Sequence, residues 1–495
     1  MKRPGLSMIL TAVALAALSI LWARWNRPPE GLTTTSRKAA DLFRSGNADA
    51  RAFRWQAAEQ TLTDAVRTDP GFAMARAALA DVQRRLGRAE AADAEAGRAD
   101  SLARLLPPGP ERWTVQLRLT LADKRFAAGR DSLLSLLANA QPHSPFVARM
   151  RALAAGGRRD PAAEEAAWRE VLRLEPNDAD AWNQLGYLAA RGGRYEEARS
   201  HLRRYAFLAP DLANPHDSLG EILTWTGDYE TAEQELLQAL RLQPDFFPSL
   251  LNLAVVYIEQ GQLSRGIGLI EQVRTQIAGT DWEMRVDGLL LQTYYDQGLV
   301  EPLRRQLDRW IEHYPDQSET GFYRALAAAL NGRFAAAQAA CDSFLARAER
   351  EPAARRDGRF QERLTMLSHN FAAITARLQG DSATAAAQYA QALAATAAWP
   401  PHEVWPLHLR YGETLRSLGR GEEALAQARL ILDVNPRRIG ALVLETKASA
   451  SLGRRDEARA ALLRLRAALA RADRDLPAVA VTDSLGALLD ARPPS

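Results

Sequence analysis

Apolar side chains recur at helical spacing along nearly all of the chain after residue 36. In the stretch 179–212, Trp182, Leu185 and Gly186 occupy positions i, i+3 and i+4, which lie on one face of an α-helix. A second stripe with the same spacing begins at Tyr195, and polar residues fill the positions between the stripes. The pattern therefore predicts two successive amphipathic helices, each with one apolar face.

Glycine and proline mark the ends of these helices. Gly192 and Gly193 follow the first helix, and glycine is favoured just past a helix C-terminus. Pro210 follows the second, where its missing N–H and fixed φ stop the helix. Two helices about 8–10 Å apart need small side chains where they touch. We therefore expect Gly186 and Ala198 to be contact points of the pair.

The two-helix unit repeats with a period of 34 residues. No single pair of helices can bury its own apolar faces, so neighbouring pairs must stack into a continuous solenoid. The period is carried by prolines, glycines and leucines at matching positions. These residues are Pro142, Pro176, Pro210 and Pro244; Gly193, Gly227 and Gly261; and Leu185, Leu219 and Leu253.

This unit resembles the tetratricopeptide repeat (TPR) family in its length and in Trp182, Leu185, Gly186, Tyr187 and Ala198. The resemblance implies an all-α fold, a right-handed TPR-type solenoid of helical pairs with about twelve repeats. The expected repeats are Ala39–Phe72, Ala73–Leu106, Glu111–Pro142, Pro145–Asp178, Ala179–Leu212, Ala213–Phe246, Phe247–Thr280, Met284–Gln317, Ser318–Glu351, Met366–Trp399, Trp405–Arg438 and Ile439–Ala472.

Interruptions of the period suggest how the chain is organised. Charged and proline-rich stretches near 349–361 and 397–403 insert residues between repeats. A last helix is expected to cover the exposed final repeat. The predicted segments are a short N-terminal tail (1–5), a transmembrane helix (6–23), a linker (24–36), an N-terminal repeat array (37–275), a C-terminal repeat array (284–472) and a capping helix (478–491).

Residues 6–23 carry no charge and would span about 27 Å as a helix, close to the ~30 Å of a bilayer's hydrocarbon core. Trp22 and Trp25 suit the membrane interface, whereas a cleaved signal peptide, the alternative, would end in small residues. We therefore predict a single-pass inner-membrane protein with a periplasmic repeat array. A cytoplasmic orientation stays open because both flanks of the segment are positively charged.

Composition fits a folded, globular chain. Hydrophobic residues make up 47% and charged residues 25% of the sequence. A net charge of +3 and the absence of an aromatic stacking platform give no reason to expect nucleic-acid binding. The single cysteine, Cys341, excludes an intrachain disulfide and falls at a core position of a predicted helix.

No residue pattern indicates catalysis, a metal or a cofactor. His402 and His408 flank a zinc-like motif, but they are six residues apart rather than four, and Pro406 between them is expected to break the helix. The stretch 266–268 lacks the third glycine and the preceding strand of a dinucleotide-binding loop. We therefore predict a protein that is not an enzyme, with no catalytic residues, metal or cofactor.

The resemblance to TPR proteins implies that the first helices line a concave groove. It also implies that the second, fifth, sixth, ninth, twelfth and thirteenth positions of each unit face this groove. In the central repeats these positions hold amides, acids and aromatics, which suit an extended peptide or a helix; for each aromatic, packing against a neighbouring helix is the alternative. The expected partner-binding residues are Asn183, Gln184, Tyr187, Asp217, Glu221, Trp225, Asn252, Gln292, Tyr295, Phe322 and Tyr323.

The leading interpretation is a membrane-anchored scaffold or adaptor that recruits protein partners in a bacterial cell envelope. One alternative is an accessory subunit of an envelope polysaccharide or secretion machine, in which Tyr187, Glu221 and Trp225 begin a glycan-binding row. Another is a sensory or regulatory repeat module, although the sequence shows no kinase, cyclase or DNA-binding segment beside the repeats.

Overall fold

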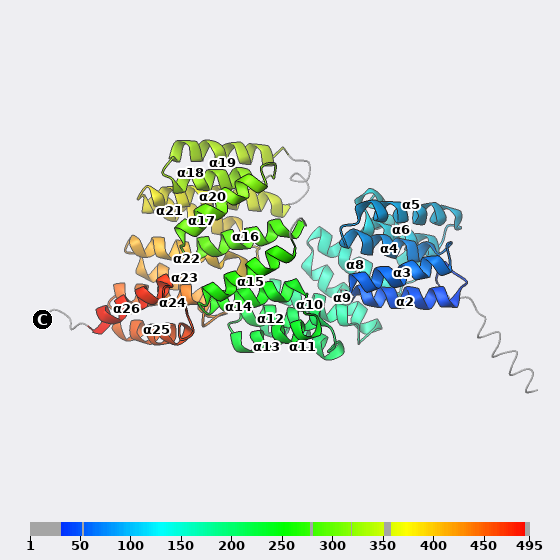
Figure 1. Ribbon diagram of the computed structural model, residues 1–495, viewed down its shortest axis with the longest axis horizontal. Coiled ribbons are helices and arrows are strands. Elements are labelled where there is room, and N and C mark those ends of the chain that lie inside the picture. The colour runs from blue at the N-terminus through cyan, green and yellow to red at the C-terminus, as the bar shows by residue number, and fades with distance from the viewer. Residues whose placement is uncertain (1–30, 52–53, 278–280, 318, 351–357, 491–495) are drawn as a thin grey trace, which may run out of the picture. The chain divides into compact units, whose positions relative to one another are not determined.

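The computed structural model describes residues 31–490 except 52–53, 278–280, 318 and 351–357. Every regular element within these residues is a helix, as the sequence pattern predicts (Figure 1). The chain divides into two compact units, the first ending at Leu185 and the second beginning at Gly186. Helix α10 (Ala179–Arg191) runs across this boundary.

Each unit is a run of helices joined by short connections. The first unit contains α2 (Arg37–Arg51), α3 (Trp55–Thr68), α4 (Ala73–Arg85), α5 (Ala89–Leu105), α6 (Pro110–Ala122), the 3-10 turn η1 (Lys124–Phe126), α7 (Arg130–Ala140), α8 (Pro145–Arg158) and α9 (Pro161–Leu174). The second unit contains α11 (Tyr195–Leu208), α12 (Ala213–Trp225), α13 (Tyr229–Leu242), α14 (Phe247–Glu259), α15 (Leu263–Gln276), α16 (Asp281–Asp296), α17 (Val300–His313), α18 (Thr320–Leu330), α19 (Phe334–Ala348), α20 (Gly358–Leu378), α21 (Ser382–Ala395), α22 (Pro401–Ser417), α23 (Gly421–Leu432), α24 (Ile439–Ser451), α25 (Arg455–Ala468) and α26 (Pro477–Asp490).

The helices stack in the order in which the sequence repeats them. Successive helices pack on one another from α2 to α9 and from α11 to α26, and first helices of neighbouring repeats also touch, as α12 does α14 and α22 does α24. Fully buried side chains such as Tyr229 and Leu236 fill the space between the layers. The last helix, α26, lies against α24 and α25.

Small residues let the two helices of a repeat approach each other closely. A Cβ atom added at Gly186 would lie 2.7 Å from the Leu202 side chain on α11, and one at Gly220 would lie 2.6 Å from Leu236 on α13. Neither leucine has room to withdraw, because both are fully buried. Gly186 is therefore a contact point of its helical pair, as predicted.

The backbone conformation explains why glycine recurs at the ends of the first helices. Gly193 and Gly227 adopt φ values of +74° and +79°, in the left-handed region. A residue in this conformation reverses the chain after a helix, and only glycine enters it without a steric cost. The second helix of the repeat begins two residues later in both cases.

The predicted inner-membrane location is corrected here. Within the part of the chain that the structure describes, no helix is both long and apolar enough to cross a bilayer. The longest, α20, is interrupted by Arg363, His369 and Arg377, because its outer face meets water rather than hydrocarbon. The predicted transmembrane segment 6–23, on which this location depended, lies outside the described residues.

The expectation that Pro406 breaks its helix is also wrong. Helix α22 runs from Pro401 through Pro406 to Ser417. Pro406 lies only in the second turn, where its missing N–H costs one backbone hydrogen bond, and the rest of the helix is unaffected. The two histidines of the zinc-like motif point to different neighbours. His402 stacks on Trp225, and His408 Nδ1 lies 2.7 Å from Gln427 Oε1.

Candidate binding site: a pocket where the array closes on itself

In the second unit, the C-terminal repeats fold back onto the central ones (Figure 1). The indole of Trp225 on α12 stacks on the His402 ring at the start of α22, with ring centroids 3.7 Å apart. The backbone N–H of Asp473 donates to the Gly261 carbonyl at 2.9 Å, and the Asp473 carboxylate accepts the Ser264 N–H at 2.7 Å. Segments more than 170 residues apart in sequence are thus held side by side.

The most deeply buried part of this arrangement is centred on Asn435, which follows α23 and has no exposed surface. Its amide Nδ2 donates to the Tyr229 hydroxyl at 3.1 Å and to the Thr224 carbonyl at 3.5 Å. Its Oδ1 accepts a hydrogen bond from the Arg437 N–H at 3.1 Å. A Cβ atom added at Gly227 would lie 2.5 Å from this oxygen, so a side chain there would clash with it. The amide is satisfied on both sides, as a buried polar group must be.

Charged pairs surround these contacts. Arg437 Nη2 lies 2.9 Å from Glu230 Oε1, and the next residue, Arg438, pairs with Glu259 at the end of α14. Both arginines come from the connection between α23 and α24, and both acids from the central repeats. We call the six residues Trp225, Tyr229, Glu230, His402, Asn435 and Arg437 the closing contact.

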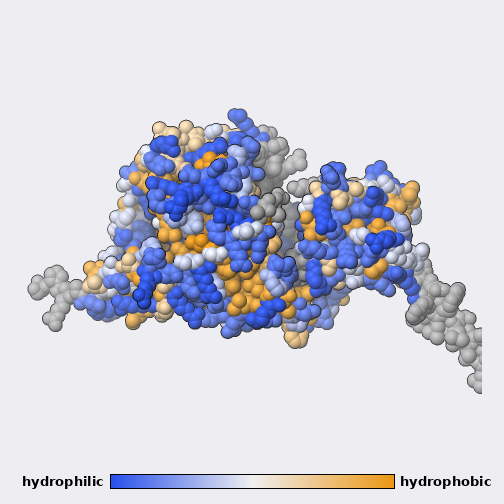
Figure 2. All heavy atoms as spheres, in the orientation of Figure 1, coloured by the Kyte–Doolittle hydropathy of each residue, from blue (hydrophilic) through white to orange (hydrophobic). Residues whose placement is uncertain are grey.

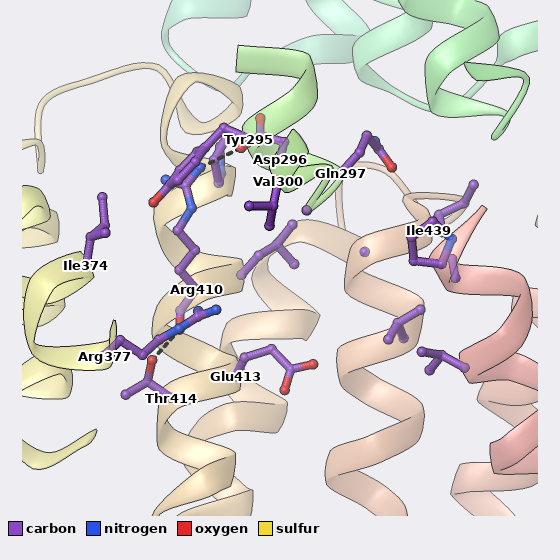
Figure 3. A pocket seen from close by; sticks show the side chains of 18 of the residues that line it. Tyr295, Asp296, Gln297, Val300, Ile374, Arg377, Arg410, Glu413, Thr414 and Ile439 are labelled. Carbon is purple, nitrogen blue, oxygen red and sulfur yellow. Dashed lines mark hydrogen bonds and ion pairs between the residues drawn. The ribbon is translucent and has the colours of Figure 1, made fainter. Parts of the chain in front are cut away.

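A pocket of about 780 Å³ lies inside the closed unit, with walls contributed mainly by α14, α16, α20, α22, α24 and the start of α26 (Figure 3). Most of its wall is apolar. Figure 2 shows apolar side chains gathered in the middle of one face of this unit, bordered by polar ones. The apolar wall residues include Val300, Leu303, Leu330, Ile374, Leu378, Leu409, Ile439, Val443 and Val481.

One wall of the pocket is built on a ring–cation contact. The guanidinium of Arg410 on α22 lies 3.9 Å from the centroid of the Tyr295 ring on α16 and pairs with Asp296 at 2.5 Å. Figure 3 shows these three side chains meeting at one edge of the pocket. Burial raises the pKa of the Tyr295 hydroxyl, so it stays protonated at neutral pH.

A second charged group lies on α22 and α24. Glu413 accepts from Lys447 at 2.9 Å and from Arg416 at 2.9 Å, so one carboxylate serves two cations. Burial alone would raise the pKa of Glu413, but Lys447 and Arg416 hold it below its ordinary value.

Arg377, near the end of α20, is exposed and lies beside the Tyr389 hydroxyl. It forms no ion pair with any residue that the structure describes.

A second polar cluster lies on the inner surface of α10, α12 and α14. The Tyr187 hydroxyl donates to Glu221 Oε2 at 2.7 Å. Ser249 Oγ and Asn252 Nδ2 donate to Asp217 Oδ1 at 2.8 and 3.0 Å. Burial raises the pKa of Asp217 to about 6, against these hydrogen bonds, and raises that of Glu221 to about 7, with the Asp217 charge adding to the shift.

The structure places the predicted partner-binding residues in several different surroundings. It brings together Tyr187, Asp217, Glu221 and Asn252 in the inner cluster, and it puts Tyr295 in the pocket wall. Gln292 is exposed and donates to Asp296 at 2.6 Å. Asn183 is buried and Gln184 is half-buried, both in the unit that ends at Leu185.

The remaining aromatic candidates pack against helices or the folded-back repeats. Trp225 is stacked in the closing contact. Phe322 is 8% exposed and meets Phe371 edge-on, and the Tyr323 ring lies 4.7 Å from that of Trp310. For these three, the packing alternative describes the surroundings that the structure shows.

The charged wall residues were missing from the candidates chosen on sequence, although the repeat register reaches them. Counting from Trp405, the sixth and ninth positions of the unit are Arg410 and Glu413. Counting from Met366, the twelfth is Arg377. These C-terminal repeats match the repeat pattern less closely than the central ones, so the register is a weaker guide there.

Comparisons with known proteins agree with the repeat pattern. Residues 167–200 and 216–246 each match the family described as Tetratricopeptide repeat. A TPR repeat-containing protein of Pseudomonas aeruginosa is 42% identical over 96 residues, which are 19% of this chain and 16% of the relative. The chain therefore matches a small part of that relative's length.

Solved structures with similar helical arrangements include three of different kinds. An O-GlcNAc transferase mutant of Thermobaculum terrenum is 28% identical, covers 27% of this chain and 26% of its own, and has a TM-score of 0.26. The Cut9–Hcn1 hetero-tetramer of the APC/C is 13% identical over 91% of this chain and 84% of that one, with a TM-score of 0.44. Yeast Tom70 is 16% identical, covers 91% of this chain and 96% of its own, and has a TM-score of 0.39.

The 34-residue period, the paired helices and the two matched segments lead to one assignment. The chain contains tetratricopeptide repeats.

Proposed function

We propose that this chain is a protein-interaction scaffold whose partner binds the inner surface of the first helices in the second unit. The observation that supports this most is the inner cluster of Tyr187, Glu221, Asp217 and Asn252, which spans three successive first helices. Protein partners also fit the general use of TPR arrays, whose stacked helices offer an extended surface. The binding role proposed here needs no membrane attachment.

The inner cluster suits the recognition of a peptide or a helix. Its side chains are fixed by hydrogen bonds to one another, so little conformational entropy is lost when a partner orders them further. Tyr187, Glu221 and Asn252 are partly exposed, and Gln292 on α16 is exposed. Aromatic and amide groups on successive helices can contact side chains that recur along an extended segment. The glycan-binding alternative is less well supported, because the Tyr187 hydroxyl bonds to Glu221 and the Trp225 ring is stacked on His402.

Site-specific photo-crosslinking tests this proposal. A benzophenone amino acid is placed at Tyr187 or at Gln292, and the full chain is irradiated in extract of the source cells. The account predicts that both inner positions crosslink to the same discrete protein.

The matched control is Phe207, an aromatic residue of α11 that is 72% exposed. Benzophenone at Phe207 should give no link to that protein. Equal crosslinking from Phe207 and Tyr187, or none from either inner position, would contradict binding on the inner surface.

A further inference from the structure

The pocket in the second unit has the size and the lining of a small-molecule site. Its volume of about 780 Å³ falls within the range of roughly 300–1,000 Å³ that is typical of ligand pockets. Val300 and Leu378, both on its wall, are 46% exposed. Large aliphatic side chains left open to water are unfavourable, and a hydrocarbon ligand would remove them from it.

The apolar part of the wall is continuous with the hydrophobic core. Leu303 and Ile374 belong to a buried cluster against which Tyr294, Tyr295 and Leu330 also pack. All five side chains line the pocket as well. An apolar chain in this part of the pocket would therefore meet mainly aliphatic and ring carbon.

The charges of the wall leave a positive surplus. Its cations are Arg377, Arg410, Arg416, Arg438 and Lys447, and its carboxylates are Asp296, Glu259 and Glu413. Asp296 and Glu259 are each used by one arginine, and Glu413 is shared by Lys447 and Arg416. Arg377 is the cation that no described carboxylate neutralises. The surplus favours an anionic ligand, with its charge at Arg377.

Backbone chemistry distinguishes between the kinds of anion that could enter. The wall comes almost entirely from helices, whose N–H and C=O groups are bonded to one another. A peptide inside the pocket would bring an N–H and a C=O for each residue and find few partners for them. A hydrocarbon chain with a single charged end needs polar partners only at that end.

We propose that this pocket binds a fatty-acid carboxylate with a tail of about the length of dodecanoate. The carboxylate pairs with the guanidinium of Arg377, whose planar fork matches it. The hydrocarbon tail lies along Leu378, Ile374, Leu330 and Leu303 towards Val300. This ligand is separate from the protein partner proposed above, which would contact the inner cluster on α10, α12 and α14.

Calorimetric titration of the full chain with sodium dodecanoate tests the proposal. We expect saturable binding of one dodecanoate per chain and at least tenfold weaker binding of dodecanol, which lacks the charge. Sodium butyrate, which has the carboxylate without the tail, should not bind measurably. Equal affinity for dodecanoate and dodecanol, or uptake of many molecules without saturation, would overturn the proposal.

Two variants separate the head from the tail. Arg377→Gln should weaken dodecanoate binding about tenfold and leave dodecanol binding unchanged, because a charged hydrogen-bonded pair is lost. Leu378→Ser should weaken the binding of both dodecanoate and dodecanol, because both tails lose an apolar contact. Both side chains are exposed, so neither change should unfold the protein.

The matched control is Arg203→Gln, an exposed arginine of α11 far along the array from the pocket lining. It should bind dodecanoate as the unaltered chain does. An Arg377→Gln protein that also binds normally would refute the assignment. So would a Leu- and Glu-containing peptide that binds more tightly than dodecanoate and is equally weakened by Arg377→Gln.

Discussion

At the residue scale, two carboxyl groups lie one helical turn apart on α12, Asp217 buried and Glu221 only partly exposed. Asp217 is 6% exposed, and Glu221 faces the Tyr187 hydroxyl across the space between first helices. Burial disfavours the ionised form of each group, and the Asp217 charge further disfavours ionisation of Glu221. The inner cluster is therefore held together best when at least one of these groups is protonated.

Stability should depend on pH through this pair. The pKa of Glu221 is raised from 4.5 to about 7 and that of Asp217 from 3.8 to about 6 in the folded chain. An acid whose folded pKa is raised binds more protons when folded than when unfolded, so the free energy of unfolding falls as pH rises. The contribution of this pair to the free energy of unfolding is fully present below pH 4 and is lost as pH rises through 6 and 7.

Urea denaturation between pH 5 and pH 8 measures this effect. Glu221→Gln keeps the hydrogen bond from Tyr187 without the charge. In this variant the urea concentration at the unfolding midpoint should fall less between pH 5 and pH 8 than in the unaltered chain. The control is Glu312→Gln, an exposed carboxyl on α17, which should leave the slope of the unaltered chain in place. A Glu221→Gln slope identical to that of the Glu312→Gln protein would show that the pair does not titrate as described.

At the element scale, the spacing of the two helices in a repeat is set by single small residues. Gly220 on α12 lies against the fully buried Leu236 of α13, and Gly268 on α15 has no heavy atom near its would-be Cβ. Both glycines lie inside helices, where alanine has the higher helix propensity. The same substitution should thus have opposite effects at the two positions.

Gly220→Ala is expected to lower the free energy of unfolding by about 1–3 kcal/mol, because the added methyl group overpacks the α12–α13 contact. Gly268→Ala is expected to raise it by about 0.4–1 kcal/mol, since it only restricts the unfolded chain. Urea denaturation of the two variants side by side measures the difference. Two changes of the same sign would mean that the helices are not packed as closely as described.

Much of this element-scale order could be predicted from the sequence. The 34-residue period gives the helical pairs, and Gly186 was expected at a helix contact where Leu202 indeed meets it. Local periodicity suffices here because each repeat packs mainly on its neighbours. The continuation of α22 through Pro406 was not predicted, because the rule that proline ends a helix does not hold near a helix start.

The candidate site could be predicted only in part. The repeat register places Tyr187, Glu221 and Tyr295 on the inner surface, but it contains no information on which distant repeats meet. The closing contact depends on particular side chains rather than on the repeat period: His402 lies in the insertion near 397–403, and Asn435 lies in the connection after α23. No sequence pattern therefore predicts that His402 stacks on Trp225, and the repeat register alone places Trp225 in an open groove.

At the scale of the whole second unit, a stack of helical pairs returns on itself and encloses a pocket. A stack of helical pairs gains its stability from neighbouring interfaces, so contacts between distant repeats add a constraint that the period alone does not supply. Some of these contacts are apolar, such as the packing of Leu476 in one buried cluster with Ile258, and others are polar. Asn435, for instance, has no exposed surface and bonds to both Tyr229 and Thr224. Closure creates the pocket and covers part of the inner surface at once.

The closure can be measured directly by cysteine crosslinking across the closing contact. Glu230→Cys and Arg437→Cys are combined with Cys341→Ala, which removes the native thiol, and the full chain is treated at low concentration with a short bismaleimide. The Glu230 and Arg437 side chains touch at their charged ends, so the shorter cysteine side chains need the reagent to bridge them. We predict a rapid intrachain crosslink, identified by mass spectrometry. A control pair of Glu312→Cys and Arg437→Cys should stay unlinked. A Glu230–Arg437 pair that stays unlinked as well, or links only between chains, would show that the repeats do not close on one another.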